Sequence, residues 1–218
     1  MPGDNLKLAN QFAAEYDSTI NDENWIGPQI LFLELNPFLQ PKSNILDLGI
    51  GTGASSVPFK KENHQITGVD DSVEMLKICK AKNIAEKLIL HDLEKMPLPL
   101  TDQSFHAVIS NGVFHLIHPI LPVIEEIKRL LIPNGYFVFT FEKSADLENS
   151  TEIKPGIWEK RTNTGVLTYK HSTDYIFEIL RRNNFKIIFQ TEFLAFVNQQ
   201  PEKEYYFTVL VARLNPPD

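Results

Sequence analysis

Cysteine, basic charge and long apolar runs are all scarce in this chain. Its single cysteine, Cys79, cannot form an internal disulfide, and without a CxxC pair there is no thiolate zinc site. The 21 Lys and Arg residues are outnumbered by 28 Asp and Glu residues, and the net charge of −7 opposes binding to a phosphate backbone. The sequence therefore predicts a reducing compartment and no nucleic-acid partner.

No stretch approaches the ~20 uncharged apolar residues of a membrane-spanning helix, and no basic patch followed by an apolar run marks the start. We therefore expect a cytoplasmic protein without a membrane partner. The 218 residues, 43% of them hydrophobic, are enough for the core of one domain that needs no disulfide or structural metal. A single domain over residues 1–218 is the expectation.

The spacing of apolar residues predicts an alternation of helices and strands. Helical spacing over 6–16 and 24–35 predicts two leading helices, which we expect to form a cap over residues 1–40. Between residues 43 and 141, short apolar segments alternate with helical ones, which is typical of a parallel sheet. The expected strands are 43–48, 65–70, 87–91, 105–110 and 136–141, and the expected helices are 55–61, 73–79 and 120–131.

The last third of the chain has a different pattern. Residues 142–170 are expected to form an insertion that is irregular up to a hairpin around 163–165. Ser172 or Thr173 can cap a helix that runs to about Arg182. Two β-rich runs, 185–197 and 205–214, follow, and the short loop 198–203 between them is too short for a crossover helix. Residues 171–218 are therefore expected to close the sheet with an antiparallel hairpin, so that its strands number seven.

A glycine cluster directly after the first expected strand is the strongest local feature. Gly49, Gly51 and Gly53 permit left-handed turns and close approach of a ligand to the backbone. Gly49 and Gly51, with Ala54, also satisfy the dinucleotide fingerprint G-x-G-x-x-G/A. A nicotinamide-dependent oxidoreductase is therefore an alternative, and a tight turn without a ligand is another.

Three acidic residues, Asp47, Asp70 and Asp92, lie at or just beyond the carboxyl ends of expected strands. Open α/β sheets bind ligands at that edge, so these side chains should share one crevice. Asp70 has roughly the offset from the glycines at which an acid accepts both ribose hydroxyls, although ordinary turn residues would give the same pattern. A carboxylate at Asp47 disfavours a nearby pyrophosphate and favours a cationic amino-acid ligand.

Three segments resemble the motifs of class I S-adenosylmethionine-dependent methyltransferases. They are residues 45–53 (Ile-Leu-Asp-Leu-Gly-Ile-Gly-Thr-Gly), 68–76 (Gly-Val-Asp-Asp-Ser-Val-Glu-Met-Leu) and 130–136 (Leu-Leu-Ile-Pro-Asn-Gly-Tyr). The resemblance covers residues 43–141. It implies a Rossmann-like, mostly parallel sheet, methyl transfer as the activity, S-adenosylmethionine as the cofactor and S-adenosylhomocysteine as its product.

The resemblance also implies roles for individual residues. The loop that contains Gly49, Gly51 and Gly53 would cradle the methionine part, with Asp47 placing the loop and the amino group. Asp70 would hold the ribose, Asp71 and Ser72 would lie beside the adenine, and Asp92 with Leu93 would receive its amino edge. Ser110, at the end of the fourth expected strand, completes the cofactor set.

Methyl transfer needs alignment more than acid–base chemistry, but a histidine could remove a proton from the acceptor. His115, beyond the fourth strand, and His171, before a capped helix, are the candidates, and a structural role for both is the alternative. No HxH or HExxH pattern is present, so we expect no metal.

Aromatic residues outside the expected sheet favour a small-molecule acceptor in a mostly apolar pocket. The candidates are Phe12, Tyr16, Trp25, Trp158 and Tyr169, which could instead pack the cap onto the domain.

Two departures from the family pattern limit the prediction. His106 stands where an acid is common, and residues 110–114 lack the Pro-Pro-Tyr continuation of enzymes that methylate adenine or glutamine. A cofactor-binding module without catalysis is a further alternative.

Overall fold

The structure is a computed structural model that describes residues 3–22, 25–142, 147, 149–199 and 202–216. Its main sheet has the order β3-β2-β1-β4-β5-β10-β9. The strands β1 to β5 are parallel, and β10 pairs antiparallel with both β5 and β9. The strands are β1 (Asn44–Leu48), β2 (Gln65–Asp70), β3 (Lys87–Leu90), β4 (Phe105–Ser110), β5 (Leu131–Glu142), β9 (Phe185–Gln199) and β10 (Glu202–Leu214). The seven-stranded, mostly parallel α/β fold with a closing hairpin is confirmed.

Helices cover both faces of this sheet. The helices are α1 (Gly3–Asp22), α2 (Gly27–Leu35), α3 (Val57–Lys61), α4 (Val73–Ala81), α5 (Leu121–Leu130) and α6 (Thr173–Arg182), with 3-10 turns η1 (Asn36–Phe38), η2 (Ala54–Ser56) and η3 (Phe114–Leu116). One core cluster contains Leu31, Phe59 and Cys79 and joins α2, α3 and α4 to the sheet. The other contains Ile127 and Leu180 and joins α5 and α6 to the opposite face.

Local sequence explains where the principal helices begin. Ser72 and Ser172 are the N-caps of α4 and α6, and their hydroxyls accept hydrogen bonds from the N–H groups of Met75 and Tyr175. In α2 and α5, a proline in the first turn suits a position whose N–H would have no helical partner. Within the described ranges, no helix combines the length and the apolar character needed to cross a bilayer.

Several boundaries differ from the sequence-based expectations. Helix α1 extends beyond the expected 6–16 in both directions, and α2 begins at Gly27 instead of residue 24, which lies outside the described residues. Strand β5 starts five residues earlier than expected, directly at the end of α5. The hairpin strands continue to Gln199 and from Glu202, so the expected loop is shorter, and its residues 200 and 201 lie outside the described part.

A second sheet lies within the region expected to be an insertion. It contains β6 (Thr151–Lys154), β7 (Ile157–Arg161) and β8 (Leu167–His171) in that order. The hairpin expected around 163–165 joins β7 to β8. Strand β6 was missed because every one of its side chains is exposed, so it has no alternation of buried and exposed residues.

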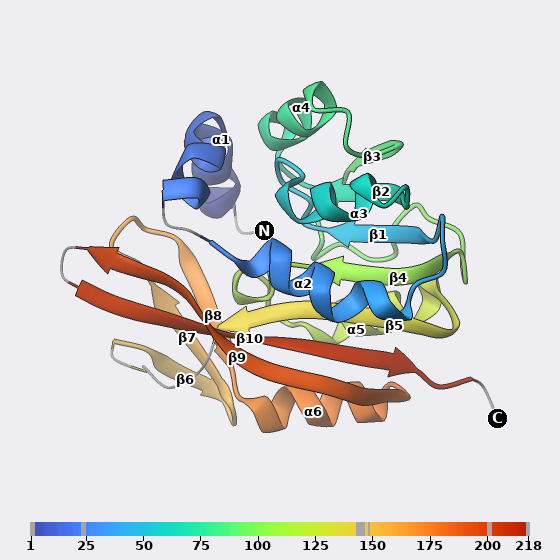
Figure 1. Ribbon diagram of the computed structural model, residues 1–218. Coiled ribbons are helices and arrows are strands. Elements are labelled where there is room, and N and C mark those ends of the chain that lie inside the picture. Colours follow the sequence, from blue (N-terminus) through green and yellow to red (C-terminus); the bar gives the residue numbers. More distant parts are fainter. Residues whose placement is uncertain (1–2, 23–24, 143–146, 148, 200–201, 217–218) are drawn as a thin grey trace.

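Helix α1 is placed at the edge of the sheet where the parallel strands end. Figure 1 shows it on the side toward which β1, β4 and β5 point, next to α4, with which it is in contact. In parallel α/β folds this edge carries the ligand site. Of the two helices expected to form a cap over residues 1–40, α1 therefore lies over the region where a ligand would bind, whereas α2 is packed in the core on one face of the sheet.

Candidate functional site

The loop after β1 folds back over the end of β2. The N–H groups of Gly49 and Ile50 both donate to the carbonyl oxygen of Val69, at 2.8 and 3.1 Å. Gly49 has a φ of 76°, and a Cβ there would lie 2.4 Å from a methyl carbon of Val113. Only glycine fits this position, because both the backbone conformation and the neighbouring side chain exclude a Cβ.

Asp70 connects this loop to the start of α4. Its Oδ2 accepts a hydrogen bond from the N–H of Gly51 at 2.8 Å, and its Oδ1 accepts one from the N–H of Ser72 at 2.8 Å. Burial raises the pKa of Asp70 to about 6, although these backbone bonds act in the opposite direction. Asp70 therefore holds the glycine loop and the start of α4 together, and it also lines a cavity between the glycine loop and α1.

Asp47 lies behind the glycine loop and is 1% exposed. Its Oδ2 accepts a hydrogen bond from the hydroxyl of Ser56 at 2.7 Å. Burial raises the pKa of Asp47 to about 7, the Ser56 bond lowers it, and the negative charge of Asp70 raises it further. A cation bound nearby would favour the ionised form of this carboxyl group.

A cavity of about 590 Å³ opens between the glycine loop and α1. Its walls come from the ends of the parallel strands, from η3, from one face of α1 and from the turn between β7 and β8. They contain Asn5, Leu8, Ala9, Gln11, Phe12, Glu15, Tyr16, Gly49, Gly51, Asp70, Asp71, Met75, Leu93, Asn111, Gly112, Val113, Leu116, Ile117, Thr164 and Val166. Most of the lining is apolar, as expected for a small-molecule pocket.

Polar side chains hold the wall of the cavity after β4. The Thr140 hydroxyl donates to Asn111 Oδ1 at 2.8 Å and accepts from the N–H of Gly112 at 2.9 Å. Asn111 Nδ2 in turn donates to the Ser55 hydroxyl at 3.0 Å. These bonds connect β5, the loop after β4 and the turn after the glycine loop, so three elements share one rigid wall.

Three polar residues of α1 fasten the helix over the cavity. Asn5, 3% exposed, donates to the carbonyl of Leu167 at 2.8 Å and accepts from the N–H of Leu167 at 2.9 Å. Asn10 Oδ1 accepts a hydrogen bond from the Ser72 hydroxyl at 2.8 Å.

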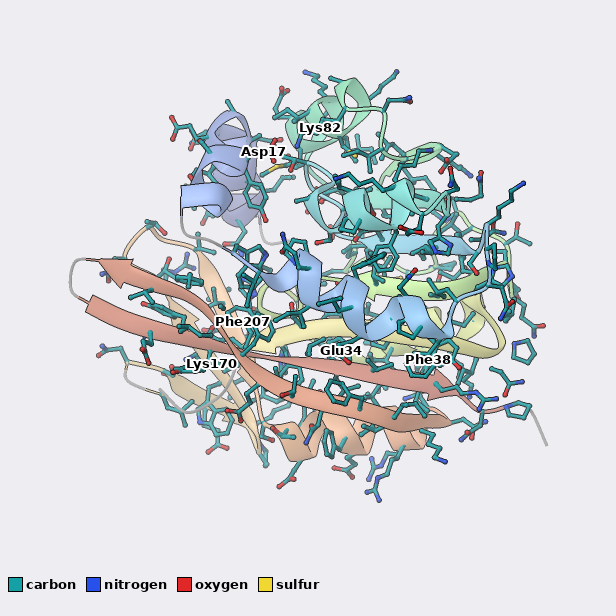
Figure 2. All side chains as sticks on the ribbon, viewed as in Figure 1. Asp17, Glu34, Phe38, Lys82, Lys170 and Phe207 are labelled. Atoms are coloured by element: carbon teal, nitrogen blue, oxygen red, sulfur yellow. The ribbon has the colours of Figure 1, made fainter. Side chains whose placement is uncertain are left out.

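The third fastening residue is Asp17. Its Oδ1 accepts a hydrogen bond from the Thr52 hydroxyl at 2.6 Å, and it forms an ion pair with Lys82, which it faces between α1 and α4 in Figure 2. Helix α1 is thus bonded to the glycine loop, to α4 and to β8. Asn5, Asn10 and Asp17 were not predicted as site residues. The only feature of the sequence that could have indicated them is the recurrence of polar residues along an amphipathic helix.

The predicted cofactor residues divide between the cavity and its support. Gly49, Gly51, Asp70, Asp71 and Leu93 line the cavity. The others lie outside the lining. A Cβ on Gly53, which has a φ of 90°, would lie 2.7 Å from Ile84 and 3.0 Å from Cys79. The Ser72 hydroxyl bonds to Asn10, and the Ser110 hydroxyl donates to the carbonyl of Leu48 at 2.9 Å. An Asp92 oxygen accepts a hydrogen bond from the N–H of Glu94, within its own turn.

The two candidate catalytic histidines lie outside the cavity lining. The ring of His115 packs edge-on against Phe207 at 6.1 Å, and His171, 2% exposed, stacks on Tyr175 at 5.7 Å. Burial lowers the pKa of His115, and burial together with neighbouring His118 and His115 lowers the pKa of His171 to about 4. Both imidazoles are therefore neutral near pH 7.

Of the predicted acceptor-binding aromatics, Phe12 and Tyr16 line the cavity. Trp25 packs against the β9–β10 hairpin, with its ring 5.2 Å from that of Phe207. Trp158 lies in β7, and the ring of Tyr169 in β8 lies 5.1 Å from that of His118. These three residues are not in the lining. Trp25 packs against the hairpin, and Tyr169 packs against His118.

His106, the departure from the family pattern, has a structural role. Its Nδ1 accepts a hydrogen bond from the N–H of Asn44 at 3.0 Å, at the start of β1. A neutral imidazole provides this acceptor, as a carboxylate would. No group of three or more His, Cys, Asp or Glu residues in the described part of the chain is arranged to hold a metal ion.

Comparison with known proteins agrees with this geometry. Residues 46–139 match the model of a family described as a methyltransferase domain. The matched segment begins in β1 and ends in β5, so it contains the glycine loop, Asp70 and Leu93. S-adenosylmethionine is the cofactor of this methyltransferase family.

Two relatives and one solved structure show how far the similarity extends. A malonyl-[acyl-carrier protein] O-methyltransferase of Hamiltonella defensa is 32% identical over 119 residues, or 55% of this chain and 44% of that protein. A demethylmenaquinone methyltransferase of Tropheryma whipplei is 28% identical over 138 residues, or 61% of this chain and 56% of that protein. The chain thus spans about half the length of these curated relatives.

The solved structure is the Burkholderia thailandensis 1,6-didemethyltoxoflavin-N1-methyltransferase with 1,6-didemethyltoxoflavin and S-adenosylhomocysteine bound. It superposes with a TM-score of 0.66 at 19% identity and covers 95% of this chain and 87% of that chain. At this identity the similarity establishes a shared methyltransferase fold.

The residues at the site fit S-adenosylmethionine. The carboxylate of Asp70 faces the cavity, where it suits the ribose hydroxyls, and a Cβ on Gly51 would meet only open space, so a ligand can approach the backbone there. Met75 and Leu93 line the cavity and would supply apolar walls for the adenine. The buried acid Asp47 would favour the positive charge of the methionine part.

Asp47→Asn should stabilise the cofactor-free protein at pH 8 by about 1–3 kcal/mol, because it removes a buried charge and keeps the acceptor for Ser56. The folded state binds the Asp47 proton more tightly than the unfolded state, so wild-type stability falls as pH rises from about 4 to about 7. The gain should therefore be full above pH 7 and absent at pH 4. Urea unfolding at both pH values, with the exposed-site variant Glu125→Gln as control, measures it, and an equal gain at both would contradict the assignment.

The affinity for S-adenosylmethionine should fall about tenfold between pH 8 and pH 6. Binding of this cation favours ionised Asp47, which below pH 7 must first lose a proton. Calorimetric titration across this range tests the prediction. In Asp47→Asn the affinity should be weaker at pH 8 and nearly constant down to pH 6.5, and a wild-type affinity that does not change with pH would refute the role of Asp47.

Proposed function

We propose that the protein is a methyltransferase that moves a methyl group from S-adenosylmethionine to a small-molecule acceptor. The observation that carries the proposal is the cavity. One wall has the glycine loop, Asp70 and Leu93, and the opposite wall is α1. One cavity therefore adjoins both the cofactor residues and a separate, mostly apolar surface suited to a second molecule.

Each part of the site has a function in this proposal. Asp70 and the glycine loop hold and orient the cofactor, which when bound supplies a methyl group already activated by the sulfonium. The wall formed by Asn111, Gly112 and Val113 positions the acceptor side of the cavity relative to the loop. Helix α1 covers one side of the cavity, where it would exclude water from the reacting atoms. Alignment of the acceptor atom with the methyl group is then the main contribution of the protein to the rate.

Neither His115 nor His171 takes the acceptor's proton in this mechanism. Neither ring lines the cavity, and both pack against aromatic rings. A structural role for both histidines, the alternative already drawn from the sequence, accounts for these contacts. A nucleophile that loses its proton in water before transfer requires no protein base.

The relatives' names support a small acceptor group but differ in its chemistry. They specify a malonyl group on an acyl-carrier protein, demethylmenaquinone and 1,6-didemethyltoxoflavin. The cavity of about 590 Å³ is of a size suited to the cofactor together with a small molecule.

Titration of the protein with S-adenosylmethionine, S-adenosylhomocysteine and NADH, side by side, is the first test. We expect both sulfur nucleosides to bind with micromolar affinity and NADH not to bind at millimolar concentration. Incubation with a small-molecule extract and methyl-labelled S-adenosylmethionine should then place label in the small-molecule fraction. Label confined to precipitated protein or nucleic acid would overturn the acceptor class, and binding of NADH alone would indicate an oxidoreductase. Cofactor binding without transfer to any fraction would favour a non-catalytic module.

A further inference from the structure

Helix α1 presents two distinct faces, and only one of them is occupied by the rest of the protein. Asn10, Ala13 and Asp17 have the spacing i, i+3 and i+7, and the contacts of Asn10 and Asp17 place this face against α4 and the glycine loop. Leu8, Phe12 and Glu15 have the spacing i, i+4 and i+7, and this second face lines the cavity. The helix is therefore fixed by the first face and by Asn5 at the start of the second face, and the later side chains of the second face are offered to a ligand.

The position of the cavity face is well defined. Asn5 ties the start of α1 to β8 through two hydrogen bonds to Leu167, and Asp17 ties its later turns to Thr52 and Lys82. Because the helix is bonded near both ends, the side chains between these two points have fixed positions over the cavity. The turn between β7 and β8 adds Thr164 and Val166 to the same wall.

The chemistry of this face combines aromatic rings with one acid. The rings of Phe12 and Tyr16 meet edge to face at 6.0 Å, and Phe12 is 40% exposed. Glu15 lies between them along the helix and also lines the cavity. The charged side chains of the described lining are all acidic: Glu15 on this face, and Asp70 and Asp71 on the cofactor side.

We propose that this face selects an acceptor that carries a flat ring and a cationic amine. The inference rests on the proposed function, since it concerns the second molecule in the same cavity. The ring would pack against Phe12 and Tyr16, whose faces also attract a cation, and the amine would lie toward the carboxylate of Glu15. An anionic acceptor would instead meet the carboxylate of Glu15 on this face and the net charge of −7 of the whole chain.

Three probes with the same ring test the charge preference: 2-phenylethylamine, 2-phenylethanol and 3-phenylpropanoate. Each is titrated into the protein saturated with S-adenosylhomocysteine. We expect the amine to bind at least tenfold more tightly than the carboxylate, with the alcohol between them. Glu15→Gln should reduce the ratio of amine to carboxylate affinity about fivefold, whereas the exposed-site control Glu125→Gln should leave it unchanged. Phe12→Leu should weaken all three probes because the ring contact is lost, and the amine most, because the face of the Phe12 ring also attracts the ammonium group.

The outcomes separate this inference from the proposed function. S-adenosylhomocysteine binding is measured first in the same samples, and its absence would count against the methyltransferase proposal itself. If the nucleoside binds but the amine does not bind at millimolar concentration, or binds no better than the carboxylate, the amine preference is wrong. An amine preference that Glu15→Gln leaves intact would equally overturn the role of Glu15.

Discussion

The two hydrogen bonds accepted by Asp70 are the interaction on which the site depends. One oxygen holds the N–H of Gly51 in the glycine loop, and the other holds the N–H of Ser72 at the start of α4. These two segments are the first loops after β1 and β2, so a single carboxylate sets the distance between them. The same carboxylate faces the cavity, and the geometry of the loops and the position of the proposed ribose partner are therefore fixed together.

The residues that organise the cofactor side also fasten the lid over it. The Ser72 hydroxyl caps α4 by accepting from the N–H of Met75 and also donates to Asn10 of α1. Thr52, in the glycine loop, donates to Asp17 of α1. Helix α1 is consequently attached to the elements that would hold the cofactor, and it reaches β8 through Asn5. The arrangement has an energetic cost, because the acids at positions 47 and 70 are buried and have raised pKa values.

Much of the fold and the cofactor side of the site followed from local sequence. The strand ends, the glycines and the acids at 47 and 70 are close together in sequence, and each has a physical reason for its position. The fastening of α1 could not be predicted, because Asn5 and Leu167 are 162 residues apart. The need for a glycine at position 68, in the middle of β2, could not be predicted either. A Cβ on Gly68 would lie 2.4 Å from the side chain of Ile50, which is distant in sequence. The histidines and three of the aromatics have residue types that suit a site, but tertiary packing places them beside it.

The most direct test of this account is the affinity of S-adenosylmethionine for Asp70→Ala, measured by calorimetry beside the wild type and the exposed-site variant Asp174→Ala. Circular dichroism establishes that all three proteins are folded. Removing Asp70 releases the glycine loop from α4 and removes a carboxylate from the cavity, so the account predicts a loss of about 30-fold or more, equivalent to roughly 2 kcal/mol. Asp174→Ala should bind as the wild type does. A folded Asp70→Ala protein with unchanged affinity would contradict the central role of this carboxylate.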